Sequence, residues 1–199
     1  MAGWGNLVNR TAAMIAKNVG EIPAQGDLEE IDTALLDQIR EGFTTVGGLI
    51  EAHRQRAAIA EIMRLVGEAN AYVSRTEPFK LKAEDQRPRL LTVLHVLAQA
   101  VTDLNTMLAP FLPQSANAVE KALGGARQIA PMPRIDEVED LDGGPGYPII
   151  TGDYTDVPAW GHHPVGVGQR VVKPTPIFVK LDPATAAEEL ERLEAAAEA

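Results

Sequence analysis

The sequence predicts an all-α fold: an antiparallel five-helix bundle, then an extended tail rich in proline and glycine, then a short C-terminal helix. Apolar residues recur about every 3.6 positions through the first 123 residues. Proline and glycine interrupt that pattern at short intervals, and short connections favour antiparallel neighbours. We therefore expect a bundle over residues 1–125, an extended and partly mobile tail over 126–183, and a helix over 184–199.

The first two helices follow from the spacing of apolar side chains. The pattern from Trp4 to Ile15 predicts a first helix over residues 3–18, which ends before Gly20. A second helix is expected to begin near Asp27, acting as its N-cap, and to continue to Ile50. The adjacent pair Gly47-Gly48 weakens this helix, which allows a kink or break there.

Prolines separate the next three helices. A third helix, carrying Ile59 to Val73, should end by Glu77, because the residue before a proline disfavours the helical region. A fourth should begin near Arg87-Pro88 and run to Leu108. It is apolar on more than one face, which is typical of a central, buried helix. Two prolines, Pro110 and Pro113, end it. A short fifth helix, 115–123, is expected to stop at Gly124-Gly125.

The tail has few periodic apolar positions and is expected to lie over the bundle. Its one apolar anchor comprises Ile177, Phe178 and Leu181. Asp182-Pro183 then precedes the last predicted helix, 184–197, which is rich in alanine and glutamate and marginally stable by itself.

Composition excludes several classes of function. The chain has 199 residues, no cysteine and a net charge of −10. Without cysteine there are no disulfides, thiolate metal sites or cysteine nucleophiles. There is neither a membrane-spanning run nor a signal-peptide pattern, so we expect a cytoplasmic protein without membrane contact. A charge-driven nucleic-acid binder is usually basic, so any such binding must be local.

One basic stretch stands out in this acidic chain. Residues 54–89 hold eight basic and five acidic residues. Two interpretations remain open: a solvated helix face, or a docking surface for a phosphate backbone.

Nothing in the sequence predicts a catalytic or metal site. The four histidines form no zinc-binding pattern, and the phosphate-binding and nucleophile motifs of common enzymes are absent. His95 lies within the most apolar helix, where we expect a buried, hydrogen-bonded core residue rather than a catalytic one. Composition and periodicity alone therefore indicate a helical domain without chemistry of its own.

Two segments point to a function. The first helix contains Gly5-Asn6-Leu7-Val8-Asn9-Arg10-Thr11, and the third contains Ala69-Asn70-Ala71-Tyr72-Val73, followed by Pro78-Phe79. Together they resemble the anticodon-binding domain of bacterial methionyl-tRNA synthetases, which shows N-L-x-x-R on its first helix and A-N-x-Y-V before a Pro-Trp pair. Residues 54–63 and the Leu-Ala-Pro-Phe-Leu-Pro turn at 108–113 extend the resemblance, and residues 161–182 do so loosely. We see none across 126–160.

The resemblance implies that Asn6 and Arg10 contact the first bases of a C-A-U anticodon and that the ring at position 79 stacks on a base. The chemistry suits this role. Asn6 and Arg10 lie four residues apart and so share a helix face. An amide and a guanidinium read base edges, and an exposed ring stacks on unpaired bases. The family more often has Trp where this chain has Phe79, so stacking should be weaker.

The tRNA backbone would meet basic residues near these positions. The candidates for such contacts are Arg54, Arg75, Lys80 and Lys82. Structural roles compete with the reading roles: Asn6 as a helix cap or brace, Arg10 as the partner of a nearby acid, and Phe79 as a core plug after a turn.

The resemblance further implies that this chain is the tRNA-binding part of an ATP-dependent methionine–tRNA ligase. The H-I-G-H and K-M-S-K-S signatures of the catalytic domain are absent, so we expect this chain to be inactive alone and to bind no cofactor; ATP and methionine would bind the missing domain. Expected partners are methionine tRNA and that catalytic domain, and not DNA. The chain is then a fragment of the synthetase or a free-standing copy of the domain. The alternative is a helical module whose tail docks onto a separate catalytic domain or another protein.

Overall fold

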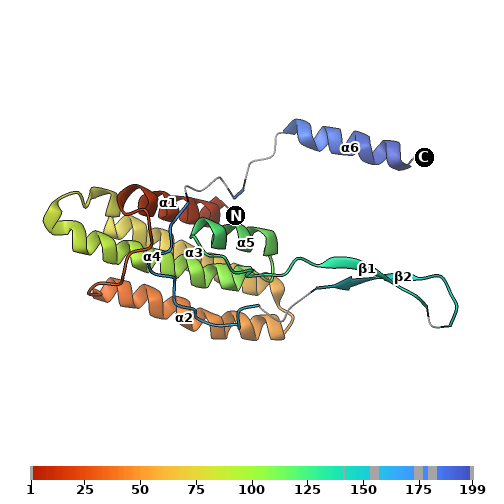
Figure 1. Cartoon of the computed structure of the whole chain (residues 1–199), viewed down its shortest axis with the longest axis horizontal. Coiled ribbons are helices and arrows are strands. Elements are labelled where there is room, and N and C mark those ends of the chain that lie inside the picture. The colour runs from red at the N-terminus through yellow and green to blue at the C-terminus, as the bar shows by residue number, and fades with distance from the viewer. Residues whose placement is uncertain (1, 141, 153–156, 173–176, 179–182, 198–199) are drawn as a thin grey trace.

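The computed structural model describes residues 2–140, 142–152, 157–172, 177–178 and 183–197. Within them are six α-helices and one two-stranded sheet. The helices are α1 (Ala2–Asn18), α2 (Glu30–Glu51), α3 (Gln55–Thr76), α4 (Arg87–Leu108), α5 (Pro113–Ala122) and α6 (Pro183–Ala197). Two short 3₁₀ turns, η1 (Pro78–Lys80) and η2 (Glu84–Gln86), connect α3 to α4. Helices α1 to α5 form the expected bundle, and successive helices run in opposite directions (Figure 1).

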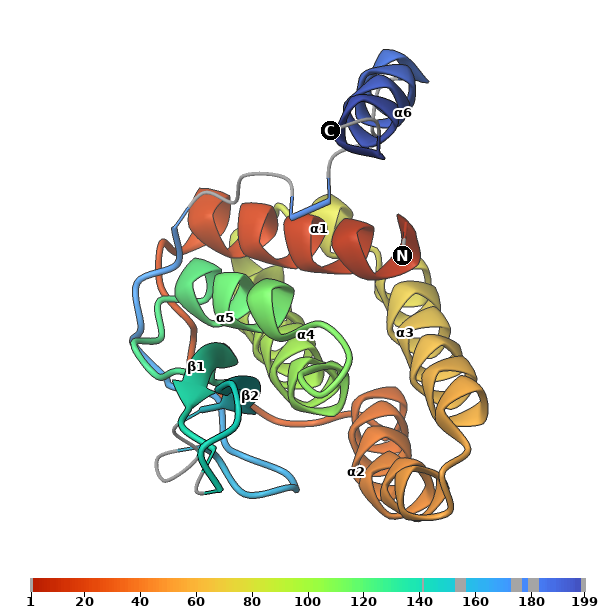
Figure 2. The ribbon, with the colours of Figure 1, turned by 90° about the vertical axis from the view of Figure 1, so that its right-hand side faces the viewer.

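Helix α4 is the centre of the bundle. Nearly every side chain from Leu90 to Leu108 is buried, and α4 packs against α1, α2, α3 and α5 (Figure 2). This confirms the prediction of a central helix from its apolar character on several faces. His95 is a core residue as expected, with its Nδ1 2.9 Å from the carbonyl oxygen of Pro23.

The structure differs from three local expectations. The N-cap of α2 is Glu29 rather than Asp27, because the Asp32 carboxylate accepts a hydrogen bond from the Glu29 N–H at 2.9 Å. Helix α2 continues unbroken through Gly47-Gly48. Pro113 begins α5 two residues before its predicted start, since proline fits the first helical position.

Part of the predicted extended tail is a β-hairpin. Strands β1 (Arg134–Val138) and β2 (Tyr147–Thr151) pair antiparallel, with Ile135 opposite Ile150. The hairpin stands away from the bundle (Figure 1), and both isoleucines are more than three-quarters exposed.

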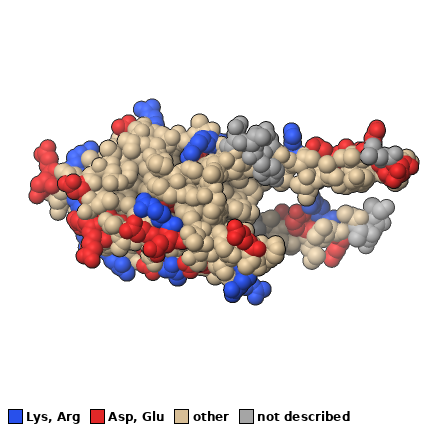
Figure 3. Space-filling model, turned by 90° about the horizontal axis from the view of Figure 1, so that it is seen from below, with Lys and Arg blue, Asp and Glu red and all other residues tan. Residues whose placement is uncertain are grey.

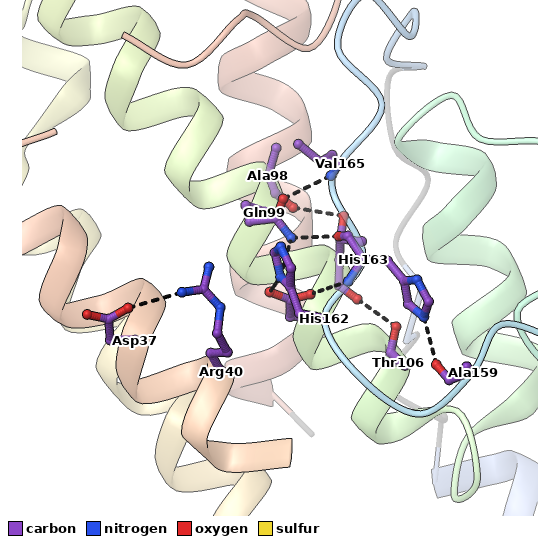
Figure 4. A network of polar contacts seen from close by, with 11 residues as sticks. Asp37, Arg40, Ala98, Gln99, Thr106, Ala159, His162, His163 and Val165 are labelled. Atoms are coloured by element: carbon purple, nitrogen blue, oxygen red, sulfur yellow. Dashed lines mark hydrogen bonds and ion pairs between the residues drawn. The ribbon is translucent and has the colours of Figure 1, made fainter. Parts of the chain in front are cut away.

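After the hairpin the chain returns across α2 and α4. Trp160 donates its indole N–H to the Phe43 carbonyl at 3.0 Å, and its ring meets the Phe43 ring edge-on. A Cβ at Gly47 would lie 3.0 Å from the Trp160 nitrogen, so a glycine there lets the indole lie close to α2. Two residues on, the His162 ring donates to the buried Asp103 carboxylate at 2.9 Å (Figure 4). Burial raises the pKa of Asp103, although the bond from His162 opposes that shift.

Residues 168–172 then lie beside the loop that follows α1. The Ile22 N–H donates to the Gln169 carbonyl at 2.9 Å, and the Val171 N–H to the Gly20 carbonyl at 3.1 Å. Val165 and Val171 complete the core. Of the predicted apolar anchor, Ile177 and Phe178 pack half-buried against the bundle; Leu181 and the expected cap Asp182 lie outside the described residues.

None of the described helices is both long enough and apolar enough to cross a membrane.

Gly124 closes α5 where the returning chain passes, which gives a stability prediction. Its φ is +81°, and a Cβ would lie 2.3 Å from the Arg170 carbonyl oxygen. We expect Gly124→Ala to lower the free energy of unfolding by about 2 kcal/mol or more, measured by urea denaturation. Gly48→Ala is the control: it lies inside α2 with open space around it, and should be neutral or stabilising. Equal effects of the two changes would contradict this account.

Candidate nucleic-acid interface

Helix α1 presents a polar, acid-free face to solvent. Trp4, Leu7 and Val8 are buried in the core, whereas Asn6 is exposed and Arg10 half-buried. The helix contains Arg10 and Lys17 and no acidic residue. Positions 6, 10 and 17 fall on one side of a 3.6-residue helix. We call these three residues the α1 stripe; Lys17 was not among the predicted site residues.

The competing structural roles of Asn6 and Arg10 are not observed in the described part of the chain. Neither side chain makes a hydrogen bond or ion pair with a described residue. Both are therefore available to an external ligand.

Phe79 is held outside the core by its neighbours. Pro78 is buried and Leu81 half-buried, whereas Phe79 is 51% exposed. Glu77 ends α3 in the left-handed region with φ +43°, which turns the chain at this point. Its carboxylate pairs with Lys80 at 2.7 Å. The described position of Phe79 is thus that of an accessible ring rather than a core plug.

The α1 stripe and the Phe79 turn extend toward the same end of the bundle (Figure 1). Asn18, the last residue of α1, lines one depression together with Leu81, Lys82 and Arg87. At 1.5 Å per residue, Asn6 lies about 18 Å back along α1 from that end. The depression thus joins the end of α1 to the connection that carries Phe79.

The predicted backbone contacts divide into two places. Arg75, Lys80 and Lys82 are exposed at the end of α3 and in the connection after it. Arg54 precedes α3 at its opposite end, about 30 Å away at 1.5 Å per residue. The structure therefore groups three of the four with Phe79. On the side opposite α1, acidic and basic side chains are interspersed without a continuous basic patch (Figure 3).

A buried carboxylate joins three helices at the end of the bundle that carries Phe79. Asp32, at the start of α2, is fully buried and accepts hydrogen bonds from Tyr72 in α3 at 2.7 Å and from Arg89 in α4. The Arg89 contact is bidentate, with Nη2 2.9 Å from Oδ1. Arg89 also pairs with Glu29 at 3.1 Å. We call Asp32, Tyr72 and Arg89 the Asp32 cluster.

Electrostatics within the Asp32 cluster favour the ionised carboxylate. Burial opposes ionisation, but the hydrogen bonds from Arg89 and Tyr72 outweigh it and lower the pKa of Asp32. Burial, followed by the bond to Asp32, raises the pKa of Tyr72 far above its usual value, so its hydroxyl remains a donor. The bond to Asp32 raises the pKa of Arg89.

Sequence reasoning missed the Asp32 cluster, although Tyr72 belongs to the A-N-x-Y-V segment. The same holds for Asn70, whose amide donates to the Gly3 carbonyl of α1 at 3.2 Å and to the Val66 carbonyl at 2.9 Å. The sequence signal that could have revealed these contacts is the presence of two polar residues, Asn70 and Tyr72, among the apolar positions of the third helix. Their partners lie 40 and 67 residues away, which periodicity does not reveal.

Among the described residues, no group of histidine and acidic side chains is arranged to hold a metal ion.

Comparison with known proteins identifies the class. Residues 22–150 match the family described as the anticodon binding domain of methionyl tRNA ligase. The fold is thus that of a helical anticodon-binding domain of an aminoacyl-tRNA synthetase. The match covers β1 and all of β2 except Thr151, so the expectation of no resemblance across 126–160 was wrong for residues 126–150, and alignment with a relative over 98% of the chain extends the likeness beyond them.

Relatives and solved structures agree with this class. The methionine–tRNA ligase of Nocardioides sp. is 60% identical over 194 residues, and that of Kineococcus radiotolerans 56% over 192. The alignments cover 98% and 95% of this chain and 32% of each relative. The crystal structure of apo Mycobacterium tuberculosis methionyl-tRNA synthetase matches with a TM-score of 0.70 and 25% identity, over 91% of this chain and 32% of that one.

The chain belongs to the family of methionyl-tRNA ligase anticodon-binding domains. It spans about a third of the length of the relatives that it matches.

The Asp32 cluster generates a pH prediction. A carboxyl whose pKa is lowered on folding stabilises the fold above its unfolded pKa, near 3.9, and that contribution is lost as pH falls through the folded pKa. The free energy of unfolding should therefore drop below about pH 4 in the wild type and drop less in Asp32→Asn. At neutral pH we expect Asp32→Asn to cost about 3 kcal/mol, because it breaks a buried pair.

Urea titrations across this pH range measure both effects. Asp37→Asn is the control, because Asp37 forms an exposed pair with Arg40 and should matter little. Parallel pH profiles for the wild type and Asp32→Asn would show that Asp32 does not have a lowered pKa.

Proposed function

We propose that this chain recognises the C-A-U anticodon of methionine tRNA, as the tRNA-binding part of a methionine–tRNA ligase. Asn6 and Arg10 hydrogen-bond the edges of the first anticodon bases, and Phe79 stacks on a base. Lys17, Arg75, Lys80 and Lys82 contact the phosphate backbone. Arg54 lies too far along α3 to share that contact with the anticodon loop.

The observation that carries the proposal is the α1 stripe. In a chain of net charge −10, α1 has no acidic residue, and two of its polar side chains are accessible and unpaired among the described residues. An exposed ring, Phe79, lies in the connection that meets the end of α1. Accessible amide, guanidinium and aromatic groups are the combination that reads splayed single-stranded bases. Local basic charge on an acidic chain favours a site-specific RNA contact over general binding to DNA.

The remaining parts of the reaction are assigned elsewhere. ATP and methionine bind a catalytic domain that supplies the other two-thirds of the relatives' length, and this chain contributes no catalytic residue and binds no cofactor. That catalytic domain is the proposed protein partner of this chain. The proposed location is the cytoplasm, where tRNA is charged.

The test is a fluorescence anisotropy titration of labelled anticodon stem-loops at a fixed, low salt concentration. One loop carries C-A-U and the other a replaced first base. We expect tighter binding of the C-A-U loop. Equal affinity for both loops, or no binding, would contradict the proposal and favour a helical module that docks onto another protein.

Phe79→Ala should weaken binding of the C-A-U loop by roughly 1–3 kcal/mol through lost stacking. Phe79→Trp should strengthen it, because indole offers a larger stacking surface. Tyr147→Ala is the matched control, since Tyr147 is an equally exposed ring, on the hairpin. A Phe79→Ala variant that binds like the Tyr147→Ala control would exclude stacking at this position.

Arg10→Ala should cost roughly 1–3 kcal/mol and reduce discrimination between the two loops. Its control is Arg40→Ala, which removes an exposed arginine from α2 on the opposite side of the bundle. The account fails at this residue if Arg10→Ala weakens both loops equally, since that is the effect of losing only a phosphate contact.

A further inference from the structure

We propose that Asn70 and Tyr72 are positioning residues that hold the α1 stripe and the Phe79 turn at a fixed separation, so that one anticodon loop meets both. The inference rests on the proposed function and assigns a role to two residues that touch no RNA in it. Asn70 holds α1 in position, and Tyr72 holds the Phe79 turn in position.

Asn70 ties α3 to the first turn of α1. Its amide nitrogen donates to the Gly3 carbonyl oxygen at 3.2 Å, three residues before Asn6, and to the Val66 carbonyl of its own helix at 2.9 Å. Because the amide is also held to its own helix, it fixes where α1 lies along α3. The position of Asn6 and Arg10 is fixed with it.

Tyr72 and Arg89 tie the two ends of the connection that carries Phe79 to the same carboxylate. Tyr72 lies four residues before the end of α3 and donates to Asp32 at 2.7 Å. Arg89, in the first turn of α4, contacts the same carboxylate in a bidentate pair. The helices on either side of residues 77–86 are thus both bonded to one buried carboxylate, that of Asp32. The position of Phe79 depends on that anion.

The spacing of the two residues matches the two tasks. Positions two apart on a helix point in widely different directions, about 200° around the axis. Asn70 therefore reaches α1 while Tyr72 reaches α2 and α4. Tyr72 is 2% exposed, so its hydroxyl has no access to a bound RNA.

A positioning role differs from a purely stabilising one in what it changes. A stabilising residue lowers the unfolding free energy but leaves base discrimination intact well below the melting temperature. A positioning residue lowers discrimination in the folded protein, and its effect disappears once the group that it positions is removed.

The first experiment measures the affinities of both stem-loops for Tyr72→Phe, Phe79→Ala and the double variant, at a temperature where all are folded. We expect Tyr72→Phe to lower the preference for C-A-U by about three- to tenfold, the loss that follows when one positioned hydrogen bond is removed. In the Phe79→Ala background it should have almost no further effect. The control Thr102→Val removes a buried hydroxyl from α4 and should leave the preference unchanged.

The same design tests Asn70. Asn70→Ala should lower the preference by a similar factor and lose its effect in the Arg10→Ala background. Its matched control is Asn117→Ala, which removes an amide that holds residues 129–130 to α5. Additive effects in either cycle, or a preference no lower than that of the controls, would overturn the proposal for that residue.

A second measurement needs no RNA and separates this inference from the proposed function. The chain is labelled with 4-fluorophenylalanine, and its ¹⁹F spectrum is compared between variants. Tyr72→Phe should shift or broaden the Phe79 resonance and leave that of Phe43 unchanged. Asn70→Ala should move the resonance of Phe178, whose ring lies against Gly5 of α1.

Unchanged resonances would overturn the inference even if C-A-U is preferred. If the resonances move in the variants but the wild type shows no preference for C-A-U, the positioning role stands and only the anticodon function is refuted.

Discussion

One buried carboxylate organises the end of the bundle on which the candidate interface depends. Asp32 is wholly enclosed, and an ionised group there is tolerated only because Arg89, Tyr72 and the Glu29 N–H surround it with donors. Those donors come from the start of α2, the end of α3 and the start of α4. Three helix termini therefore converge on a single charge, which anchors both ends of the connection between α3 and α4.

None of these anchoring contacts uses the side chains that are proposed to read the anticodon. The side chains of Asn6, Arg10 and Phe79 have no hydrogen bond or ion pair with any described residue, whereas Lys80 beside Phe79 is paired with Glu77. Preorganisation of the helices lowers the entropic cost of binding, because the RNA loop and the reading side chains must become ordered but the backbone that carries them need not. A chain of net charge −10 can still offer a local RNA surface, because α1 contains no acidic residue; on the opposite side, acidic and basic side chains are interspersed (Figure 3).

Much of the fold could be predicted because helix periodicity is a local property. The bundle, the buried α4 and the core role of His95 followed from the spacing of apolar residues and prolines. The hairpin did not, because its five-residue strands carry charged and exposed side chains, and Ile135 pairs with Ile150 in the open. The motif pointed to Asn6, Arg10 and Phe79 as candidate readers. It did not reveal the bond between Tyr72 and Asp32, because only the folded chain brings them together.

The most direct test of the central claim is ¹⁵N NMR of the labelled chain during titration with a C-A-U stem-loop. The account predicts that the side-chain signals of Asn6 and Arg10 and the backbone amides of residues 79–82 shift together. Signals from the hairpin and from the outer face of α2 should stay in place, and a loop with a replaced first base should shift the Asn6 and Arg10 side chains less. Shifts confined to the hairpin or α2, or identical shifts with both loops, would show that the α1 stripe and the Phe79 turn do not read the anticodon.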